Sequence, residues 1–202
     1  MISVVLLLAG VALLTASPES QSAPRSRSAA TTLSCGGERW PVKTLSDRRA
    51  HLVDFHPRRT TVTRLRHKRR PHHIENDSLR RRGAERKTFR VRARLLKFAA
   101  FDDHDIHVVI SEPGHRSRTM IVEFPNVRCN GARHSIKKPA MRRARRHLRA
   151  ACGIPHSSSF THLRGKATIT GVGFFDLIHG QTGQAPNGIE LHPVLRFTDA
   201  SC

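Results

Sequence analysis

The residues best suited to chemistry in this 202-residue chain gather between Gly171 and Pro193. Asp176 and His179 flank the start of a polar, glycine-rich loop, and Glu190 and His192 stand two residues apart beyond it. Imidazole and carboxylate groups bind Zn²⁺ and similar ions, and they also serve as general bases in hydrolysis. These four side chains are therefore the candidate catalytic residues of a metal-dependent hydrolase, in particular a phosphodiesterase.

A second pair of polar residues extends this hypothesis. Asp105 and His107 are two residues apart, so they share one face of the strand expected there. If the fold brings this strand beside the later stretch, a divalent metal ion is the expected cofactor, with His107, His179 and His192 as its candidate ligands. The competing interpretation is structural, because loop side chains bind their own backbone and 14 histidines give chance pairings with carboxylates.

The charge of the chain indicates a different function. Lys and Arg number 36 against 15 Asp and Glu, giving a net charge of +21 at pH 7. Such an excess favours association with a polyanion, nucleic acid above all or an acidic cell-surface polymer, although a solvated charge run or codon bias explains it equally well. The candidate polyanion-binding residues are Arg66, Lys68, Arg69, Arg70, Arg80, Arg81, Arg82, Arg142, Arg143, Arg145 and Arg146.

Strands are predicted where apolar residues alternate with polar ones. From Thr88 the alternation runs to Leu95 and then slips by one residue at Leu96, which predicts a β-bulge. Further strands are expected at residues 106–110, 120–124, 167–174 and 189–197. Glycines 171 and 173 in the fourth of these five strands indicate a bend or a close approach of another segment.

The period changes to that of a helix between Pro139 and Cys152, with Met141, Ala144 and Leu148 on one face. The order of strand, strand, strand, helix, strand, strand predicts a mainly β fold, an OB-like five-stranded barrel with its helix between strands three and four. A small sandwich or an open α+β sheet is the alternative. Residues 88–202 form this domain, and residues 31–87 are expected to be a basic, loosely ordered arm.

The N-terminus predicts export. Residues 2–16 are an uninterrupted apolar run, too short for a usual membrane span and of the length of a secretory signal. Residues 1–30 are therefore interpreted as a signal peptide and flexible tether, with an uncleaved anchor as the alternative. No other transmembrane segment is expected, and the protein is predicted to be secreted or to lie in the cell envelope.

Four cysteines agree with an exported protein, because an even number in such a chain usually forms disulfides. Three pairings are open. We favour Cys129 with Cys152, which encloses the helix, and Cys35 with Cys202, which joins the ends of the mature chain.

The last segment also carries a resemblance. The residues GVGFFD, HGQTG and APNGIELHPV, between Gly171 and Val194, resemble those of a family of small exported bacterial proteins without an established activity. The likeness extends back to the segment ERWPVKT from Glu38, and the strongly basic residues between Arg64 and Arg86 depart from it. The resemblance implies an exported single domain and supplies no reaction.

Together these observations favour an exported OB-like module that binds a polyanion electrostatically. A secreted metal-dependent hydrolase and a cell-envelope protein without catalytic activity are the alternatives. Only 5% of the residues are aromatic and Tyr is absent, so a platform for stacking bases is not indicated.

Overall fold

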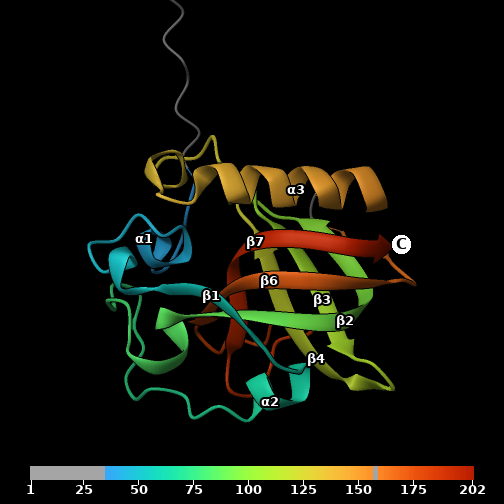
Figure 1. The fold of residues 1–202 in the computed structure, drawn as a ribbon, viewed down its shortest axis with the longest axis horizontal. Helices are drawn as coiled ribbons and strands as arrows, with labels where there is room; N and C mark the ends of the chain where they lie inside the picture. The colour runs from blue at the N-terminus through green and yellow to red at the C-terminus, as the bar shows by residue number, and fades with distance from the viewer. Residues whose placement is uncertain (1–34, 157–158) are drawn as a thin grey trace, which may run out of the picture. The chain divides into compact units, whose positions relative to one another are not determined.

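A computed structural model describes residues 35–156 and 159–202, so the predicted signal peptide and tether lie outside the described residues. The fold is mainly β, with seven strands in one sheet and few helices (Figure 1). The strands are β1 (Asp54–Arg59), β2 (Lys87–Ala100), β3 (Ile106–Glu112), β4 (His115–Phe124), β5 (Thr161–His162), β6 (Lys166–Phe175) and β7 (Ile189–Ser201). The α-helices are α1 (Trp40–Lys43), α2 (Val62–Arg66) and α3 (Lys138–Cys152), and the 3₁₀ turns are η1 (Ala50–Leu52), η2 (Gly83–Arg86) and η3 (Ala132–His134).

Five of the strands pair in a closed ring. The hydrogen-bonded order is β2, β3, β4, β7 and β6, and β6 pairs again with β2. The β4–β7 pairing is parallel and the other four are antiparallel. Strands β1 and β5 add to β2 outside the ring, so the predicted order of five strands with a helix after the third is confirmed.

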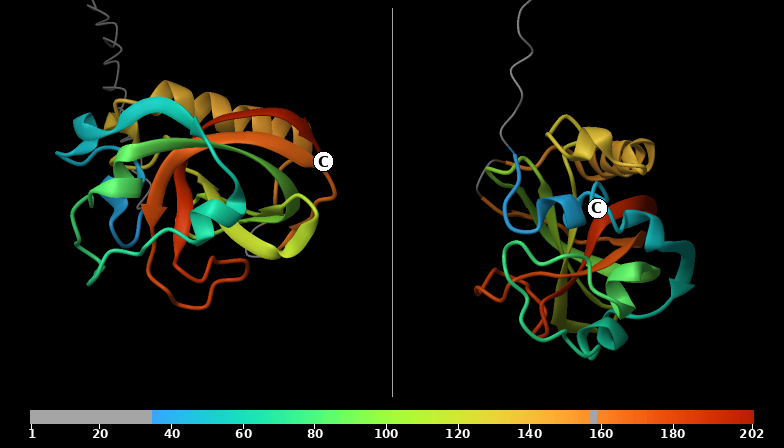
Figure 2. Two further views of the ribbon diagram at one scale, coloured as in Figure 1. Left: turned by 60° about the horizontal axis from the view of Figure 1, so that its bottom comes forward. Right: turned by 90° about the vertical axis from the view of Figure 1, so that its left-hand side faces the viewer.

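Within the ring, the long strand β2 pairs with two different neighbours along its length. Residues 88–94 pair with β6 and residues 94–100 pair with β3. Between Leu95 and Lys97 the register shifts, which is the bulge that the slip in the apolar pattern predicts. The strand therefore curves from one neighbour to the other, as the turned views show (Figure 2).

The main core lies inside the ring. Alternate residues of each strand point inward, and helix α3 packs along β7 with Met141, Ala144 and Leu148 buried. Gly173 lets β6 approach η2 closely, because a Cβ there would lie 2.6 Å from the carbonyl oxygen of Ala84. The close approach predicted for the glycines of β6 is therefore confirmed.

The segment before β2 differs from the loosely ordered arm that its composition predicts. It forms α1, η1, β1, α2 and η2, and Leu45, Val62 and Leu65 are fully buried. Two of its charged residues pair inside the protein, where Arg39 donates to both carboxylate oxygens of Glu85 at 2.7 Å. The high net charge of the segment does not predict this ordered structure. A few apolar contacts and a buried ion pair are enough to hold the segment against the rest of the protein.

All four cysteines form disulfides, but the favoured pairing is wrong. Cys35 bonds to Cys129, and Cys152 bonds to Cys202. Cys35 and Cys129 pack in one cluster with Trp40. Helix α3 lies along β7, so Cys152 at its end is close to Cys202 at the end of the chain. Two disulfides suggest an oxidising, extracytoplasmic environment. Within the described ranges, no helix is long and apolar enough to cross a membrane.

Candidate functional site

A cluster of charged side chains is buried on the outer face of the ring. Along β3, β4 and β7, the residues that alternate with the apolar core are His107, Glu123, Glu190 and His192. All four are buried, and Glu123, Glu190 and His192 have no exposed surface. The face is covered from outside by α1, whose Lys43 lies 3.4 Å from Asp176 just after β6.

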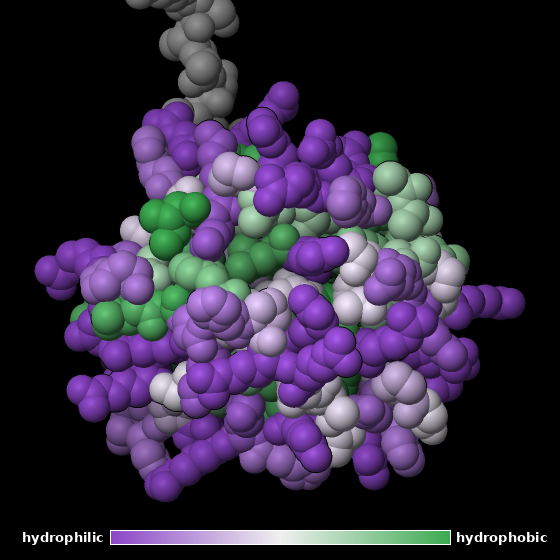
Figure 3. Space-filling view, in the orientation of Figure 1, coloured by the Kyte–Doolittle hydropathy of each residue, from purple (hydrophilic) through white to green (hydrophobic). Residues whose placement is uncertain are grey.

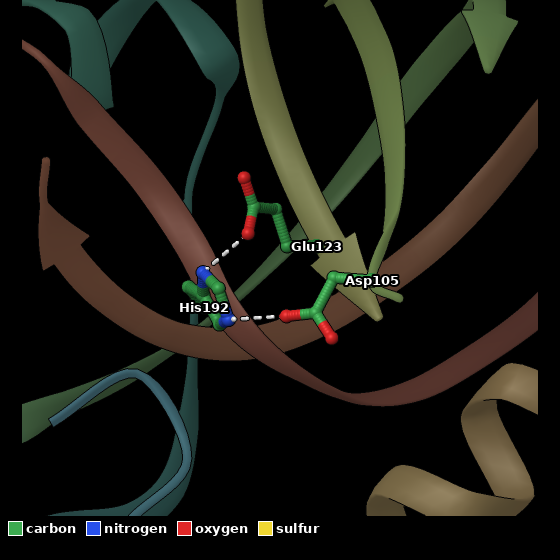
Figure 4. Close-up of side chains that lie close together, drawn as sticks. All are labelled: Asp105, Glu123 and His192. Atoms are coloured by element: carbon green, nitrogen blue, oxygen red, sulfur yellow. Dashed lines mark ion pairs between the residues drawn. The ribbon is translucent and has the colours of Figure 1, made fainter. Parts of the chain in front are cut away.

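The centre of the cluster is His192, which lies between two carboxylates (Figure 4). Its Nδ1 is 2.7 Å from Glu123 Oε2, and its Nε2 is 3.5 Å from Asp105 Oδ2. The other oxygen of Glu123 is 3.0 Å from His107 Nε2, so the glutamate joins the two imidazoles. One ligand atom from each of Asp105, Glu123 and His192 lies within 4.8 Å of the others, a spacing that can hold a metal ion.

These contacts leave the polar atoms incompletely satisfied. Both ring nitrogens of His192, both carboxylate oxygens of Glu123 and Asp105 Oδ2 lack a partner with hydrogen-bond geometry in the described residues. Glu190 is fully buried as well, and neither of its carboxylate oxygens has such a partner in the part of the chain that the structure describes. Buried polar atoms are normally hydrogen-bonded, and an ion or a water molecule is the usual explanation when they are not.

The electrostatics follow from burial and proximity. Burial alone would lower the pKa of His192, but the charge of Glu123 raises it to about 9. The pKa of His107 is raised as well, because Glu123 and Asp103 outweigh its burial. Burial, together with the charges of Glu123 and Asp176, raises the pKa of Glu190 well above its usual value. Without an ion, His192 is therefore protonated at neutral pH, while its surroundings favour the charged form of His107 and the neutral form of Glu190.

Phe174 forms the wall of the cluster beside α1. The Arg39 guanidinium lies 4.7 Å from the centre of its ring, and the Lys43 ammonium lies 5.5 Å from it. On the other side, the ring of Phe174 meets His192 edge-on at 5.7 Å between centroids. The pKa of Lys43 is raised despite its burial, because Glu123, Asp176 and Glu190 surround it with negative charge.

The predicted candidates divide into two groups. Asp176, Glu190, His192 and His107 all belong to the cluster, so the fold brings the two stretches together. His179 lies at its edge, 3.6 Å from Asp176 and with a side chain 43% exposed. Among the described residues, the three histidines predicted as metal ligands do not form one group, and the set with ligand spacing contains only His192 of them.

The sequence predictions omitted two members of the cluster. The alternation of β4 places Glu123 on the face opposite Met120 and Val122. The sequence pattern therefore predicts the face to which the Glu123 side chain points. Its contact with His192 depends on the parallel β4–β7 pairing, which joins Ile121 to Glu190 and has no local signal. Lys43 comes from α1, in a segment whose packing the composition conceals.

A hollow of about 390 Å³ lies beside the cluster, between the β3 end of the ring and the loop after β6. Its walls include Phe101, Phe160 and residues 180–182, and His107 and Asp103 line it as well. His107, which contacts Glu123, reaches this hollow and has 7% of its surface exposed. Asp105, Glu123 and His192 do not line it.

A second hollow, of about 360 Å³, lies on the outside of the protein against helix α3. It is lined by the loop residues Asn126 and Val127 and by five arginines, with no acidic side chain among its lining residues. The arginines are Arg128, Arg142, Arg145, Arg146 and Arg149. Hydrophilic side chains cover the outer side of α3 in the space-filling view, along the upper edge of the molecule (Figure 3). We call this second hollow, with its five arginines, the arginine hollow.

The helix arginines predicted to bind a polyanion are largely free to do so. Arg142, Arg143 and Arg146 are exposed on α3, and the first and last of them line the arginine hollow. Arg145 is held in place, because its guanidinium donates to the carbonyl oxygens of Phe124 and His104. This anchor fixes one guanidinium at the floor of the hollow.

The arm residues predicted for the same role behave differently. Arg80 is 1% exposed and pairs with Asp47 at 2.9 Å, so it cannot present its charge to a polymer. Arg66 donates to the carbonyl oxygen of Thr119. Arg70 donates to the carbonyl oxygens of Asp176 and Asn187. Arg81 donates to the carbonyl oxygen of His73. Lys68 is half-buried, with its ammonium over the ring of Phe89, whereas Arg69 and Arg82 are exposed.

None of the family models, curated proteins and solved structures with which the chain was compared matches it. The resemblance to small exported bacterial proteins therefore stays a prediction.

Proposed function

We propose that the protein binds a polyanion electrostatically, and that the polymer is nucleic acid held through its phosphates. The observation that carries this proposal is the arginine hollow, where five guanidinium side chains line one depression and no acidic side chain shares it. Helix α3 contributes four of them, and its sequence contains no Asp or Glu.

The residue type supports phosphate as the partner. A guanidinium group is planar and offers paired N–H donors that match two phosphate oxygens, and it stays charged at every physiological pH. Arg142, Arg146 and Arg149 follow one another at helical spacing on α3, so they form a strip that a polymer backbone can follow. Contacts of this kind hold the backbone without reading the base sequence.

The buried cluster supports catalysis less well. A catalytic metal site keeps an open coordination position for water or substrate. The side chains of Asp105, Glu123 and His192 have no exposed surface, and the neighbouring hollow reaches only His107 and Asp103 beside them. A role of the protein as a module that binds a polymer therefore agrees better with the geometry than hydrolysis does.

We further propose that the ring is an OB-like barrel and that the protein works outside the cytoplasm. The helix between the third and fourth strands of the ring, and the bulged first strand, support the barrel. The two disulfides and the apolar run at the N-terminus support export.

The test compares two variants with the same loss of charge. In the hollow variant, Arg128, Arg142, Arg146 and Arg149 are replaced by Gln, and in the control the exposed residues Arg48, Arg64, Arg116 and Arg164 are replaced by Gln. Binding of a labelled DNA duplex at about 100 mM salt should weaken roughly tenfold to hundredfold in the hollow variant and a few-fold in the control. Equal weakening would show that net charge, and not the hollow, causes binding. Binding of heparin without binding of DNA or RNA would show that the polymer is an acidic glycan.

A further inference from the structure

We propose that the buried cluster is a structural site for one zinc-like divalent cation, coordinated by His192, Asp105 and Glu123. This site is separate from the arginine hollow and does not depend on the proposed binding of nucleic acid. Its ligands come from the turn before β3 and from β4 and β7, three segments that are distant in sequence.

The first support is an imbalance of buried charge. With neutral imidazoles, the enclosed carboxylates of Asp105, Glu123, Asp176 and Glu190 carry four negative charges, against one positive charge on Lys43. From outside the cluster, the charge of Arg145 acts on Asp105 and that of Arg70 acts on Asp176, which leaves Glu123 and Glu190 with Lys43. Uncompensated charge inside a protein is strongly unfavourable. The cluster must therefore take up protons or a cation.

The second support is the set of polar atoms without hydrogen-bond partners. The nitrogens of His192 and the oxygens of Glu123 approach one another, yet their geometry is not that of hydrogen bonds in the described residues. Glu190 adds an independent observation, because its fully buried carboxylate lies two residues before His192 on the same face of β7 and has no hydrogen-bond partner. A cation bound by His192, Asp105 and Glu123 would satisfy the atoms of these three residues. Its charge would also favour the ionised form of Glu190, which lies close enough to Glu123 to feel the charge of that carboxylate.

The spacing of the central pair suits one ion. Two ligands of a tetrahedral zinc ion, each about 2.0–2.1 Å from the metal, are about 3.3 Å apart. His192 Nε2 and Asp105 Oδ2 are 3.5 Å apart, and the second oxygen of Asp105 is held by the backbone N–H of Asn126 at 2.9 Å. Glu123 contacts the other ring nitrogen, Nδ1, so its carboxylate would have to leave Nδ1 to complete the set. All three residues already offer an atom within 4.8 Å of the others.

The donor types select the class of cation. An imidazole nitrogen with carboxylate oxygens suits zinc and neighbouring transition metals, whereas Mg²⁺ and Ca²⁺ favour oxygen ligands alone. Cysteine cannot take part in the described fold, because all four cysteines form disulfides. Full burial of the three ligands makes the site closed, which is typical of a metal that stabilises the fold.

The experiment uses the full chain with its disulfides intact. The protein is unfolded in denaturant with a chelator and refolded with Zn²⁺, with Mg²⁺, or with neither, and free ion is removed by gel filtration. We expect about one zinc per chain and, with excess Zn²⁺, a melting temperature raised by roughly 5–10 °C, with no such change in Mg²⁺. Less than about 0.1 zinc per chain, with an unchanged melting temperature, would overturn the proposal.

Variants locate the ion among the 14 histidines. His192→Asn and Asp105→Asn should each lose the bound zinc and the thermal shift, while His162→Asn, an exposed histidine of β5, should keep both. If a cluster variant does not fold, X-ray absorption of the zinc-bound wild-type protein decides. It should show one imidazole among nitrogen and oxygen ligands. Two or more imidazoles, or zinc retained by a folded His192→Asn protein, would place the ion elsewhere and contradict the proposal.

Discussion

His192 shows how far one residue can depend on its neighbours for its charge. An imidazole without exposed surface should be neutral, because burial disfavours the charged form. Glu123 at 2.7 Å reverses this, and the pKa of His192 rises to about 9. The same carboxylate lies 3.0 Å from His107, so Glu123 is the residue on which the electrostatic balance of the cluster depends. Its own pKa is held well below the usual value, since the two imidazoles and Lys43 outweigh its burial.

This arrangement predicts how the stability of the metal-free protein depends on pH. Because the pKa of His192 is raised from 6.5 to about 9 on folding, its contribution is complete below about pH 6.5 and is lost as pH rises through 9. The raised pKa of His107 acts in the same direction. The free energy of unfolding in the presence of a chelator should therefore fall by about 3 kcal/mol between pH 6.5 and pH 9.5. Urea unfolding measures it, and a flat or rising profile would contradict the assignment of charge.

At the scale of elements, the segment before β2 is built into the fold by charged residues. Glu85 of η2 accepts from both terminal nitrogens of Arg39 and from the backbone N–H groups of Phe175 and Arg81. These contacts join the start of α1, η2 and the end of β6. The strong positive charge of the chain thus has two roles, since part of it is buried in such ion pairs and part is exposed on α3.

Glu85→Gln tests these contacts. The change would leave the fully buried guanidinium of Arg39 without a negative partner, which typically costs 3–5 kcal/mol. Glu75→Gln, at an exposed position before η2, is the matched control and should change the free energy of unfolding by less than about 0.5 kcal/mol. Chemical denaturation measures the free energy of unfolding of both variants. Similar values for the two would show that the contacts of Glu85 do not stabilise the fold.

The contact between β6 and η2 has its own test in Gly173. A Cβ at this position would lie 2.6 Å from the backbone oxygen of Ala84 and 2.9 Å from the ring of Phe89. Gly173→Ala should therefore lower the free energy of unfolding by about 1–3 kcal/mol. Gly37→Ala adds the same methyl group where nothing lies within 4 Å, and its thermal unfolding should match that of the wild-type protein. Equal stability of the two variants would mean that η2 moves away without cost.

For the whole molecule, local patterns in the sequence predict more than long-range ones. The alternation of Phe89, Val91 and Ala93 identifies β2, and the slip at Leu96 locates its bulge, because both depend on adjacent residues. The direction of Glu123 follows from the same period. Its meeting with His192 does not, since it requires a pairing between strands about 70 residues apart in the chain.

The disulfides and the arm were mispredicted for a related reason. Cysteine spacing leaves three pairings open, and the choice depends on how α3 lies along β7. In the arm, the high content of arginine suggested exposure, whereas Arg39 and Arg80 find buried carboxylate partners. Composition shows how many charges a segment carries and does not show which of them are paired.

Five arginines line the arginine hollow, and the dependence of DNA binding on salt tests their proposed role most directly. Each phosphate contact adds about 0.9 to the slope of the logarithm of the binding constant against the logarithm of salt concentration. Replacing Arg128, Arg142, Arg146 and Arg149 by Gln should therefore reduce this slope by about 3 to 4, and the control at Arg48, Arg64, Arg116 and Arg164 should reduce it by less than about 1. A hollow variant whose slope equals that of the wild-type protein would contradict the proposed role of the arginine hollow.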